Sequence, residues 1–171
     1  MRQGGLLDYA DEHLQPAKET ASQVERTVGE IPIPAVTAEE AWARLKGDAG
    51  SVLVDVRTSA EWAYVGLPEL SQIGKRPVLV EWQGFPDARV NHAFVERVAE
   101  GLRALGADQD SALYFLCRSG QRSLRAAQAM AAAGYRRCCN VVDGFEGPLD
   151  AHRHRGELAG WKAKGLPWTQ G

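Results

Sequence analysis

The sequence predicts an α/β protein with a mostly parallel central sheet and helices on both faces. Four short apolar runs recur along the chain, and segments with helical spacing of apolar residues lie between them. The runs are continuous rather than alternating, which is typical of strands buried on both faces of a sheet. Because strands that alternate with helices pack into layers, we expect a three-layer α/β/α arrangement.

The elements are expected in a regular order. Thr37 precedes a first helix over residues 38–46, and Glu40 completes the pattern of a capping box. Two longer helical patterns each end at a glycine that can cap a helix C-terminus. The closing segment, 156–171, contains Trp161 and Trp168 and is expected to fold back over an edge of the core. The predicted strands cover residues 52–56, 78–82, 112–116 and 140–142, and the two longer helices cover 91–105 and 123–133.

The chain is expected to hold one domain over residues 36–171, preceded by an arm over residues 1–35. A chain of 171 residues has the size of one ordinary domain with an appendage. The arm contains Pro16 and ends in the run Ile-Pro-Ile-Pro at 31–34, where the prolines favour extended chain over helix.

Composition excludes several classes of partner. The chain has 20 Lys and Arg against 22 Asp and Glu, so its net charge of −2 does not favour nucleic acid or an anionic membrane. No stretch approaches the roughly 18 apolar residues that span a bilayer, and the first residues lack the apolar core of a secretory signal. We therefore expect a cytoplasmic protein that binds neither nucleic acid nor membrane.

Three cysteines are too few for a disulfide framework, and their spacing matches no zinc pattern. No metal and no organic cofactor are expected. Cys138 and Cys139 begin the last predicted strand, where alternation turns one side chain toward the core and the other away. Ordinary packing is the favoured interpretation of this pair, and a reactive thiol is left for Cys117.

Cys117 stands between the strand at 112–116 and the helix that follows it. Ligands of open α/β sheets bind at such strand-to-helix crevices. A helix N-terminus and inward N–H groups stabilise an anion there, and Gly120 supplies the freedom in φ that the turn needs. Arg118 and Arg122 are expected to favour the thiolate further. The alternative is a buried structural thiol.

Three segments resemble the rhodanese family. Residues 117–123, Cys-Arg-Ser-Gly-Gln-Arg-Ser, look like its active-site loop. Val-Asp-Val-Arg at 54–57 with Glu61 and Trp62 looks like its first signature, and residues 142–147 resemble the segment after its last strand. The resemblance covers about residues 36–168. One departure is that the family's Gly-His-Ile-Pro-Gly-Ala is replaced by Gly-Leu-Pro-Glu-Leu at 66–70.

The resemblance implies a rhodanese-like fold and the activity of a thiosulfate sulfurtransferase. Cys117 is then the nucleophile that accepts a sulfane sulfur, for example from thiosulfate, as a persulfide. The partners are this small-molecule donor and a thiophilic acceptor such as cyanide or a thiol, with an acceptor protein as an alternative. The residues expected to bind the substrate are Arg118, Ser119, Gly120, Gln121, Arg122, Ser123 and Arg57.

Two other functions use the same fold. Cysteine-dependent phosphatases and arsenate reductases have an arginine six positions after the cysteine, whereas Arg122 comes five positions after Cys117. The shorter loop favours sulfur chemistry. The other alternative is a non-catalytic rhodanese-like module that regulates or carries sulfur. Regulatory and scaffolding modules usually lack the nucleophile, which this chain retains.

For two further features, the sequence allows either a role in the site or a role in packing. Arg57 either faces the pocket or forms a structural pair with Asp55, because buried charges need partners. The segment from Trp82 to Phe85 follows the second long strand, and it forms either a wall beside Cys117 or ordinary aromatic packing.

Overall fold

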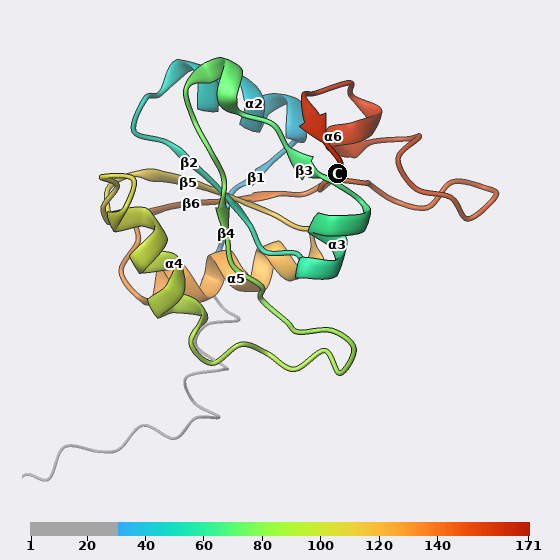
Figure 1. The fold of residues 1–171 in the computed structure, drawn as a ribbon. Helices are drawn as coiled ribbons and strands as arrows, with labels where there is room; N and C mark the ends of the chain where they lie inside the picture. The colour runs from blue at the N-terminus through green and yellow to red at the C-terminus, as the bar shows by residue number, and fades with distance from the viewer. Residues whose placement is uncertain (1–30) are drawn as a thin grey trace, which may run out of the picture.

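The computed structural model describes residues 31–171 and contains a five-stranded parallel sheet (Figure 1). The order of its strands is β1-β6-β5-β2-β4, so β5 lies at the centre, and β1 and β4 lie at the two edges. Neighbouring strands of the sheet pair in parallel. The strands are β1 (Ala35–Val36), β2 (Val52–Asp55), β4 (Val78–Leu79), β5 (Ala112–Leu116) and β6 (Arg137–Val141).

Helices cover both faces of this sheet, so the predicted three-layer α/β/α fold is confirmed. Figure 1 shows α2 (Ala38–Gly47) and α6 (Gly160–Ala163) on one face, and α4 (Phe94–Arg103) and α5 (Gln121–Ala132) on the other. The side chains of β5 alternate between the two cores. Leu113 and Phe115 join the core beneath α4 and α5, whereas Tyr114 and Leu116 join the core that contains Trp161 of α6.

The predicted elements are found, with shifts at their ends. β5 has the expected bounds, and α2 begins after Thr37 with the complete capping box. α4 begins at Phe94 rather than Asn91, because the Asn91 side chain accepts the N–H of Ala93 and forms a turn before the helix. β6 starts at Arg137, three residues before the expected strand, and extends the pairing with β5.

β4 is shorter than the expected strand because β2 ends at Asp55. The N–H groups of Val80 and Trp82 still donate to the carbonyls of Asp55 and Val56, at 3.2 and 3.1 Å. The chain therefore follows β2 beyond the two residues of regular pairing, and it delivers residues 83–88 to the carboxyl edge of the sheet.

The sequence patterns missed several short elements. α3 (Ser59–Tyr64) has no fully buried residue and hence no apolar periodicity to detect. β3 (Leu67–Pro68) pairs with β7 (Trp168–Thr169) in a separate antiparallel sheet, and η1 is a single turn at Ser71–Ile73. The closing segment folds back as expected, since Trp161 is fully buried and packs edge-on against Trp42.

Residues 31–35, at the end of the predicted arm, lie along the sheet. Ala35 pairs with Asn140, and the carbonyl of Pro34 accepts the N–H of Asn140 at 2.9 Å. The rest of the predicted arm lies outside the described residues.

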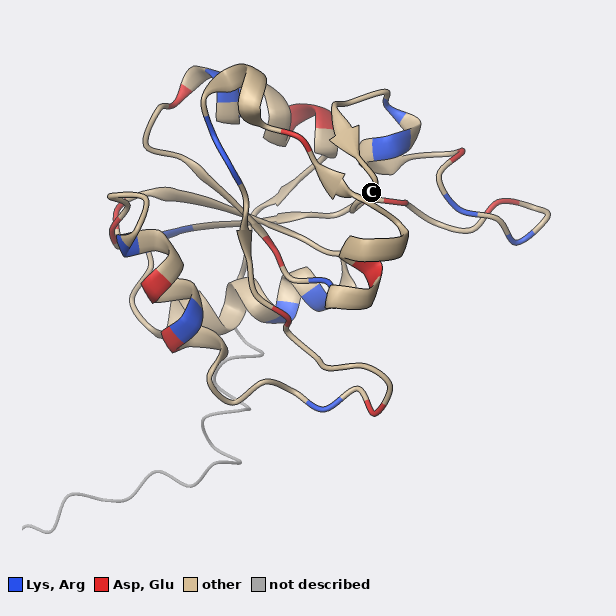
Figure 2. Cartoon of the chain, viewed as in Figure 1, with Lys and Arg blue, Asp and Glu red and all other residues tan. Residues whose placement is uncertain are grey.

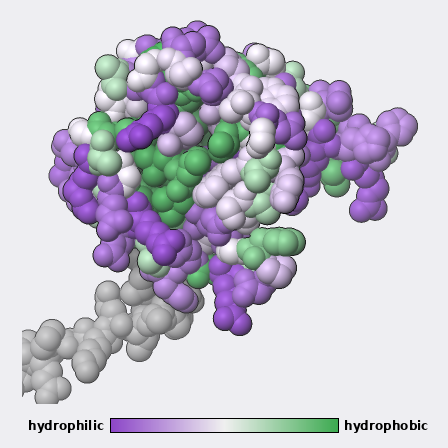
Figure 3. Space-filling model, in the orientation of Figure 1, coloured by the Kyte–Doolittle hydropathy of each residue, from purple (hydrophilic) through white to green (hydrophobic). Residues whose placement is uncertain are grey.

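Charges of both signs are interspersed over the surface in Figure 2, in keeping with the net charge of −2. Figure 3 shows apolar surface over the region of the edge strand β4, where Leu79 is exposed. Within residues 31–171, no helix combines the length and apolar character needed to cross a lipid bilayer.

Candidate active site

The candidate site is built on the loop between β5 and α5. Cys117 follows the last residue of β5, and its side chain is 1% exposed. Its Sγ lies 3.2 Å from the N–H of Gly120 and 3.2 Å from Oγ of Ser123. Two hydrogen-bond donors therefore converge on the sulfur at the N-terminus of a twelve-residue helix, where the helix dipole also favours negative charge.

Gly120 is required at its position in the loop. Its φ of +90° lies in the left-handed region, and a Cβ atom built there would stand 2.2 Å from the carbonyl oxygen of Val142. A side chain at residue 120 would therefore displace either the loop or the end of β6.

The segment after β6 supports the loop from behind. The N–H of Phe145 donates to the carbonyl of Cys117 at 2.8 Å, and the N–H of Glu146 donates to that of Arg118 at 3.0 Å. Asp143 accepts the N–H groups of Ala38 and Gly160, which begin α2 and α6. This accounts for the proximity of two sequence motifs, 117–123 and 142–147, that lie far apart in the chain.

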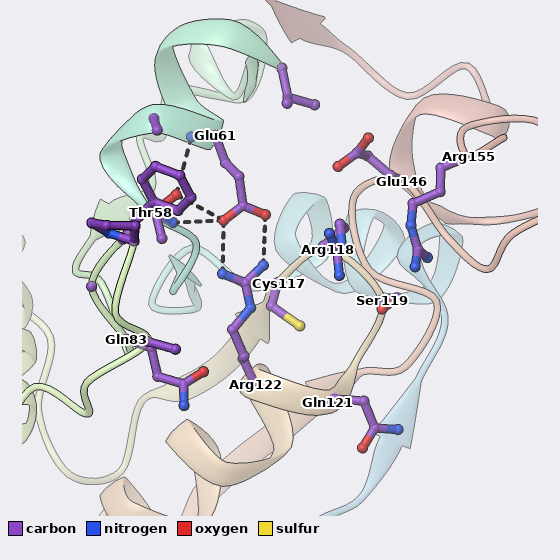
Figure 4. A pocket seen from close by; sticks show the side chains of 16 residues that line it. Thr58, Glu61, Gln83, Cys117, Arg118, Ser119, Gln121, Arg122, Glu146 and Arg155 are labelled. Carbon is purple, nitrogen blue, oxygen red and sulfur yellow. Dashed lines mark hydrogen bonds and ion pairs between the residues drawn. The ribbon is translucent and has the colours of Figure 1, made fainter. Parts of the chain in front are cut away.

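Cys117 lies at a cavity of about 710 Å³ that opens at the carboxyl edge of the sheet. Figure 4 shows its polar residues, which come from α3, the loop after β4, the cysteine loop and the segment after β6. The lining residues are Thr58, Ala60, Glu61, Val65, Gln83, Gly84, Phe85, Pro86, Ala88, Cys117, Arg118, Ser119, Gln121, Arg122, Glu146 and Arg155.

Arg122 is held by Glu61 at one side of the cavity. Its two terminal nitrogens donate to the two carboxylate oxygens at 2.7 and 2.6 Å, as the dashed lines in Figure 4 show. Burial by itself raises the pKa of Glu61, but the hydrogen bonds and charge of Arg122, with the N–H and hydroxyl of Thr58, lower it to about 2. The Arg122 charge near Cys117 is therefore compensated by a carboxylate.

Arg118 differs from Arg122 in its surroundings. Its side chain is exposed at the cavity, and no hydrogen bond or ion pair joins it to another side chain of residues 31–171. Arg155 also lines the cavity, where it donates to the carbonyl of Gly147 at 2.6 Å, with Glu146 close by (Figure 4). Among the arginines that line the cavity, Arg118 is thus the one whose guanidinium has no hydrogen-bond partner within residues 31–171.

The structure does not bring Arg57 into the cavity. Its guanidinium is fully buried on the Asp55 carboxylate, with the closest N–O distance 2.6 Å, and it donates to the carbonyl of Gly66 at 2.8 Å. It also lies 4.0 Å from the centre of the Phe145 ring. Arg57 therefore ties β2 to the segments that surround the site, because a buried charge needs such partners.

The segment after β4 divides between the two expected roles. Gln83, Gly84 and Phe85 line the cavity, with Phe85 75% exposed at its edge. Trp82 packs edge-on against Phe94 at 5.0 Å between ring centres and does not line the cavity.

Cys138 and Cys139 lie away from the cavity. Cys138 belongs to the core under α4 and α5, whereas Cys139 packs against the opposite core. Burial, and then the neighbouring Cys139, raise the pKa of Cys138 to about 12, so this thiol stays protonated. The pair therefore has the alternation expected of adjacent strand residues.

Several cavity residues were not singled out from the sequence as substrate contacts. Glu61 was expected only as part of the family signature. The spacing of Thr58 and Glu61 is that of a capping box, and this pattern in the sequence could have predicted that they lie together at the start of α3. No local pattern in the sequence places Arg155 beside Cys117. The residues missed are Thr58, Glu61, Glu146 and Arg155.

The parallel sheet and the cysteine loop at its carboxyl edge define a rhodanese-like protein. A family model described as STR4 middle domain matches residues 34–171. An uncharacterized protein of Rickettsia conorii is 35% identical over 133 residues, which cover 78% of this chain and 94% of that protein. The chain therefore belongs to the family of the STR4 middle domain.

Other relatives place the chain in the same class. Rhodanese-like domain-containing protein 4, chloroplastic, of Arabidopsis thaliana is 25% identical over 134 residues, which cover 78% of this chain but 25% of that protein. The crystal structure of Rv0390 from M. tuberculosis matches with a TM-score of 0.73 at 42% identity, covering 82% of this chain and 100% of that one. The fold and the family thus support a function of the sulfurtransferase type.

Proposed function

We propose that the chain is a thiosulfate sulfurtransferase in which Cys117 carries the transferred sulfur as a persulfide. One observation carries the proposal: the sulfur of Cys117 receives hydrogen bonds from the loop at the inner end of an open cavity. An exposed arginine, Arg118, stands beside it. Such a transfer needs a nucleophile, hydrogen-bond donors that stabilise its negative charge, and a cation that binds the anionic sulfur compound.

The reaction proceeds in two balanced steps. The Cys117 thiolate attacks the outer sulfur of thiosulfate, a Cys–S–S bond forms, and the S–S bond of thiosulfate breaks to release sulfite with the bonding electron pair. Cyanide or a thiolate then attacks the terminal sulfur of the persulfide, and the Cys117 thiolate leaves. With cyanide the product is thiocyanate, and no net oxidant is needed. Two such steps should give ping-pong kinetics.

The loop geometry favours sulfur over phosphate chemistry. Gly120 N–H already lies within hydrogen-bond reach of the single sulfur of Cys117, and Arg122, five residues after the cysteine, is turned to Glu61. A phosphate ester needs donors for three oxygens, which requires a wider ring. Inserting a residue between Gly120 and Gln121 should therefore lower the rate of sulfur transfer and introduce weak hydrolysis of an aryl phosphate. Assays of both reactions with the wild type and the insertion variant measure these changes.

The proposed partners are a small anionic sulfur donor and a thiophilic acceptor, either a small molecule or a protein thiol. The proposed compartment is the cytoplasm. The three unpaired thiols, Cys117, Cys138 and Cys139, are compatible with a reducing environment.

The test is replacement of each set of cysteines. Cys117→Ser should abolish thiosulfate:cyanide transfer and the gain of one sulfur atom in the intact mass after incubation with thiosulfate, because a hydroxyl neither ionises near neutral pH nor forms the S–S bond. The matched control, Cys138→Ser with Cys139→Ser, should keep most activity. An active Cys117→Ser variant, or a wild type that hydrolyses aryl phosphate but ignores every sulfane-sulfur donor, contradicts the proposal.

A further inference from the structure

The hydroxyl of Ser123 stands between two acceptors that cannot both receive its proton. Its Oγ lies 3.2 Å from Sγ of Cys117 and 2.7 Å from Oδ1 of Asn140 in the neighbouring strand β6. A serine hydroxyl has a single proton to donate. Whichever acceptor receives it, the other loses that hydrogen bond.

The orientation of the Asn140 amide is fixed by a second contact. Its Nδ2 donates to the carbonyl of Gly120 at 3.1 Å, and a carbonyl can only accept. Oδ1 must therefore face Ser123. Ser123 is fully buried and Asn140 is 5% exposed, so bulk water cannot replace a lost partner for either group.

We propose that Asn140 is a positioning residue for sulfur transfer, which holds the Ser123 proton while the Cys117 sulfur is neutral or persulfidated and yields it when the thiolate forms. This inference rests on the proposed function. Within residues 31–171, the Asn140 side chain forms no hydrogen bond to Cys117 or to a residue that lines the cavity, and it acts through Ser123 and Gly120.

The two positions of the proton match the two steps of the reaction. When a sulfane sulfur is attached, Sγ is neutral and a weak acceptor, and without Asn140 the buried hydroxyl would have no good partner. When the acceptor removes that sulfur, Sγ becomes a thiolate, and the hydroxyl turns back to stabilise it as a leaving group. Oδ1 of Asn140 then loses its hydrogen bond from Ser123. Ser123 therefore stabilises the thiolate less strongly than it would if Asn140 did not compete for its proton.

A titration of the Cys117 thiol tests the role of Asn140 without any sulfur transfer. In a Cys138→Ser, Cys139→Ser background, only Cys117 titrates as a thiol, which thiolate absorbance or the rate of alkylation by iodoacetamide can follow. Asn140→Leu removes the competing acceptor, so we expect the pKa of Cys117 to fall by about one unit, as a freed hydrogen bond to a charged sulfur implies. The carbonyl of Gly120 keeps the N–H of Leu124 at 3.3 Å.

The charged groups around the sulfur stay constant in this comparison. They are Arg118 of the loop and Arg122 of α5, Glu61 of α3, the Asp55–Arg57 pair at the end of β2, and Glu146 and Arg155 after β6. Ser123→Ala supplies the matched background. There, Asn140→Leu should leave the pKa of Cys117 unchanged, because the proton through which Asn140 acts is gone.

Two outcomes overturn the proposal: an unchanged or raised pKa of Cys117 in the Asn140→Leu variant, or the same shift in the Ser123→Ala background. Asn140→Val is a second variant without an acceptor and suits a strand. If neither variant folds, the wild type decides. The ¹³C shift of the Asn140 side-chain carbonyl should follow the titration of Cys117 and cease to do so in Ser123→Ala; a shift that is flat in the wild type overturns the proposal. Failure of thiosulfate turnover alone would instead count against the proposed function.

Discussion

Arg118 and Arg122 belong to the same loop, yet the structure gives them different partners. Arg122 forms a two-point ion pair with Glu61 in which both side chains are about one-fifth exposed, whereas Arg118 is exposed at the cavity. Both arginines were expected to bind the substrate. We propose that Arg122 instead holds the site together through Glu61, and that Arg118 binds the anionic sulfur donor.

Arg118→Ala should raise the KM for thiosulfate roughly 3- to 10-fold, because a charge-assisted contact at a partly solvated site contributes about 1 kcal/mol. Initial rates at varied thiosulfate give the effect. The control is Arg125→Ala, which removes the same charge from an exposed position on α5 that does not line the cavity. Equal KM changes in the two variants would mean that only the net charge matters.

Glu61→Gln should lower the free energy of unfolding above pH 5 by about 1 to 2 kcal/mol, a value reduced for the partial exposure of the pair. The folded pKa of Glu61 is about 2, below its usual 4.5. The stabilisation is therefore fully present above pH 4.5 and is lost as the pH falls toward 2. Urea unfolding across this range should show the wild type and the variant converging in acid.

Glu39→Gln is the control for that series, since it removes an exposed ion pair with Lys164. Because this pair is exposed to solvent, its effect should be much smaller than that of Glu61→Gln. A difference between wild type and Glu61→Gln that persists unchanged down to pH 2 would contradict the role of the Glu61 charge.

At the scale of the element, the cysteine loop depends on a close approach between two segments. Gly120 touches the end of β6, and Gly144 has a φ of +65° where a Cβ would lie 2.5 Å from the backbone of Arg118. The loop is thus shaped by the segment at 142–147 as well as by its own residues.

Gly120→Ala should destabilise the protein by roughly 2 to 4 kcal/mol and abolish most transfer, because it combines backbone strain with a collision against the Val142 carbonyl. Gly106→Ala is the matched control. Its φ is +70°, but nothing lies within 4 Å of its Cβ position, so only the strain of about 1 kcal/mol applies. Urea unfolding and transfer rates should separate the two; equal losses would refute the collision.

At the scale of the whole molecule, the closing segment completes the core on one face of the sheet. Trp161 is fully buried, and its Nε1 donates to the carbonyl of Pro167 at 2.7 Å. The N–H of Trp161 donates to Gly144 and that of Lys162 to Phe145, so this segment also supports the backbone behind the cysteine loop.

Trp161→Ala should lower the free energy of unfolding by about 3 to 5 kcal/mol, as expected for removal of a buried tryptophan. Trp168→Ala, at a position 38% exposed, should cost roughly 1 kcal/mol. Thermal or urea unfolding of both variants gives the comparison. A Trp161→Ala variant as stable as Trp168→Ala would show that the closing segment is not part of the cooperative core.

Strong local patterns were sufficient to predict several elements. β5 was predicted with its observed bounds because five consecutive apolar residues fit a strand buried on both faces, and α2 was predicted from the Thr37–Glu40 capping box. The position of Cys117 between a strand and a helix was also predicted from these patterns. These features are readable because residues close together in the chain produce them. α3 was missed because its six residues include no fully buried side chain.

Which side chains meet around Cys117 depends on how distant segments of the chain pack together. Glu61 takes up the Arg122 guanidinium, Arg155 lies in the cavity, and Arg57 is turned away onto Asp55. Asn140 reaches Ser123 because α5 packs against β6. Such pairings depend on packing between segments distant in the chain, and their electrostatic partners leave no periodic signal in the sequence. The sequence could therefore indicate the kind of site, while the division of roles among its residues depends on the packed fold.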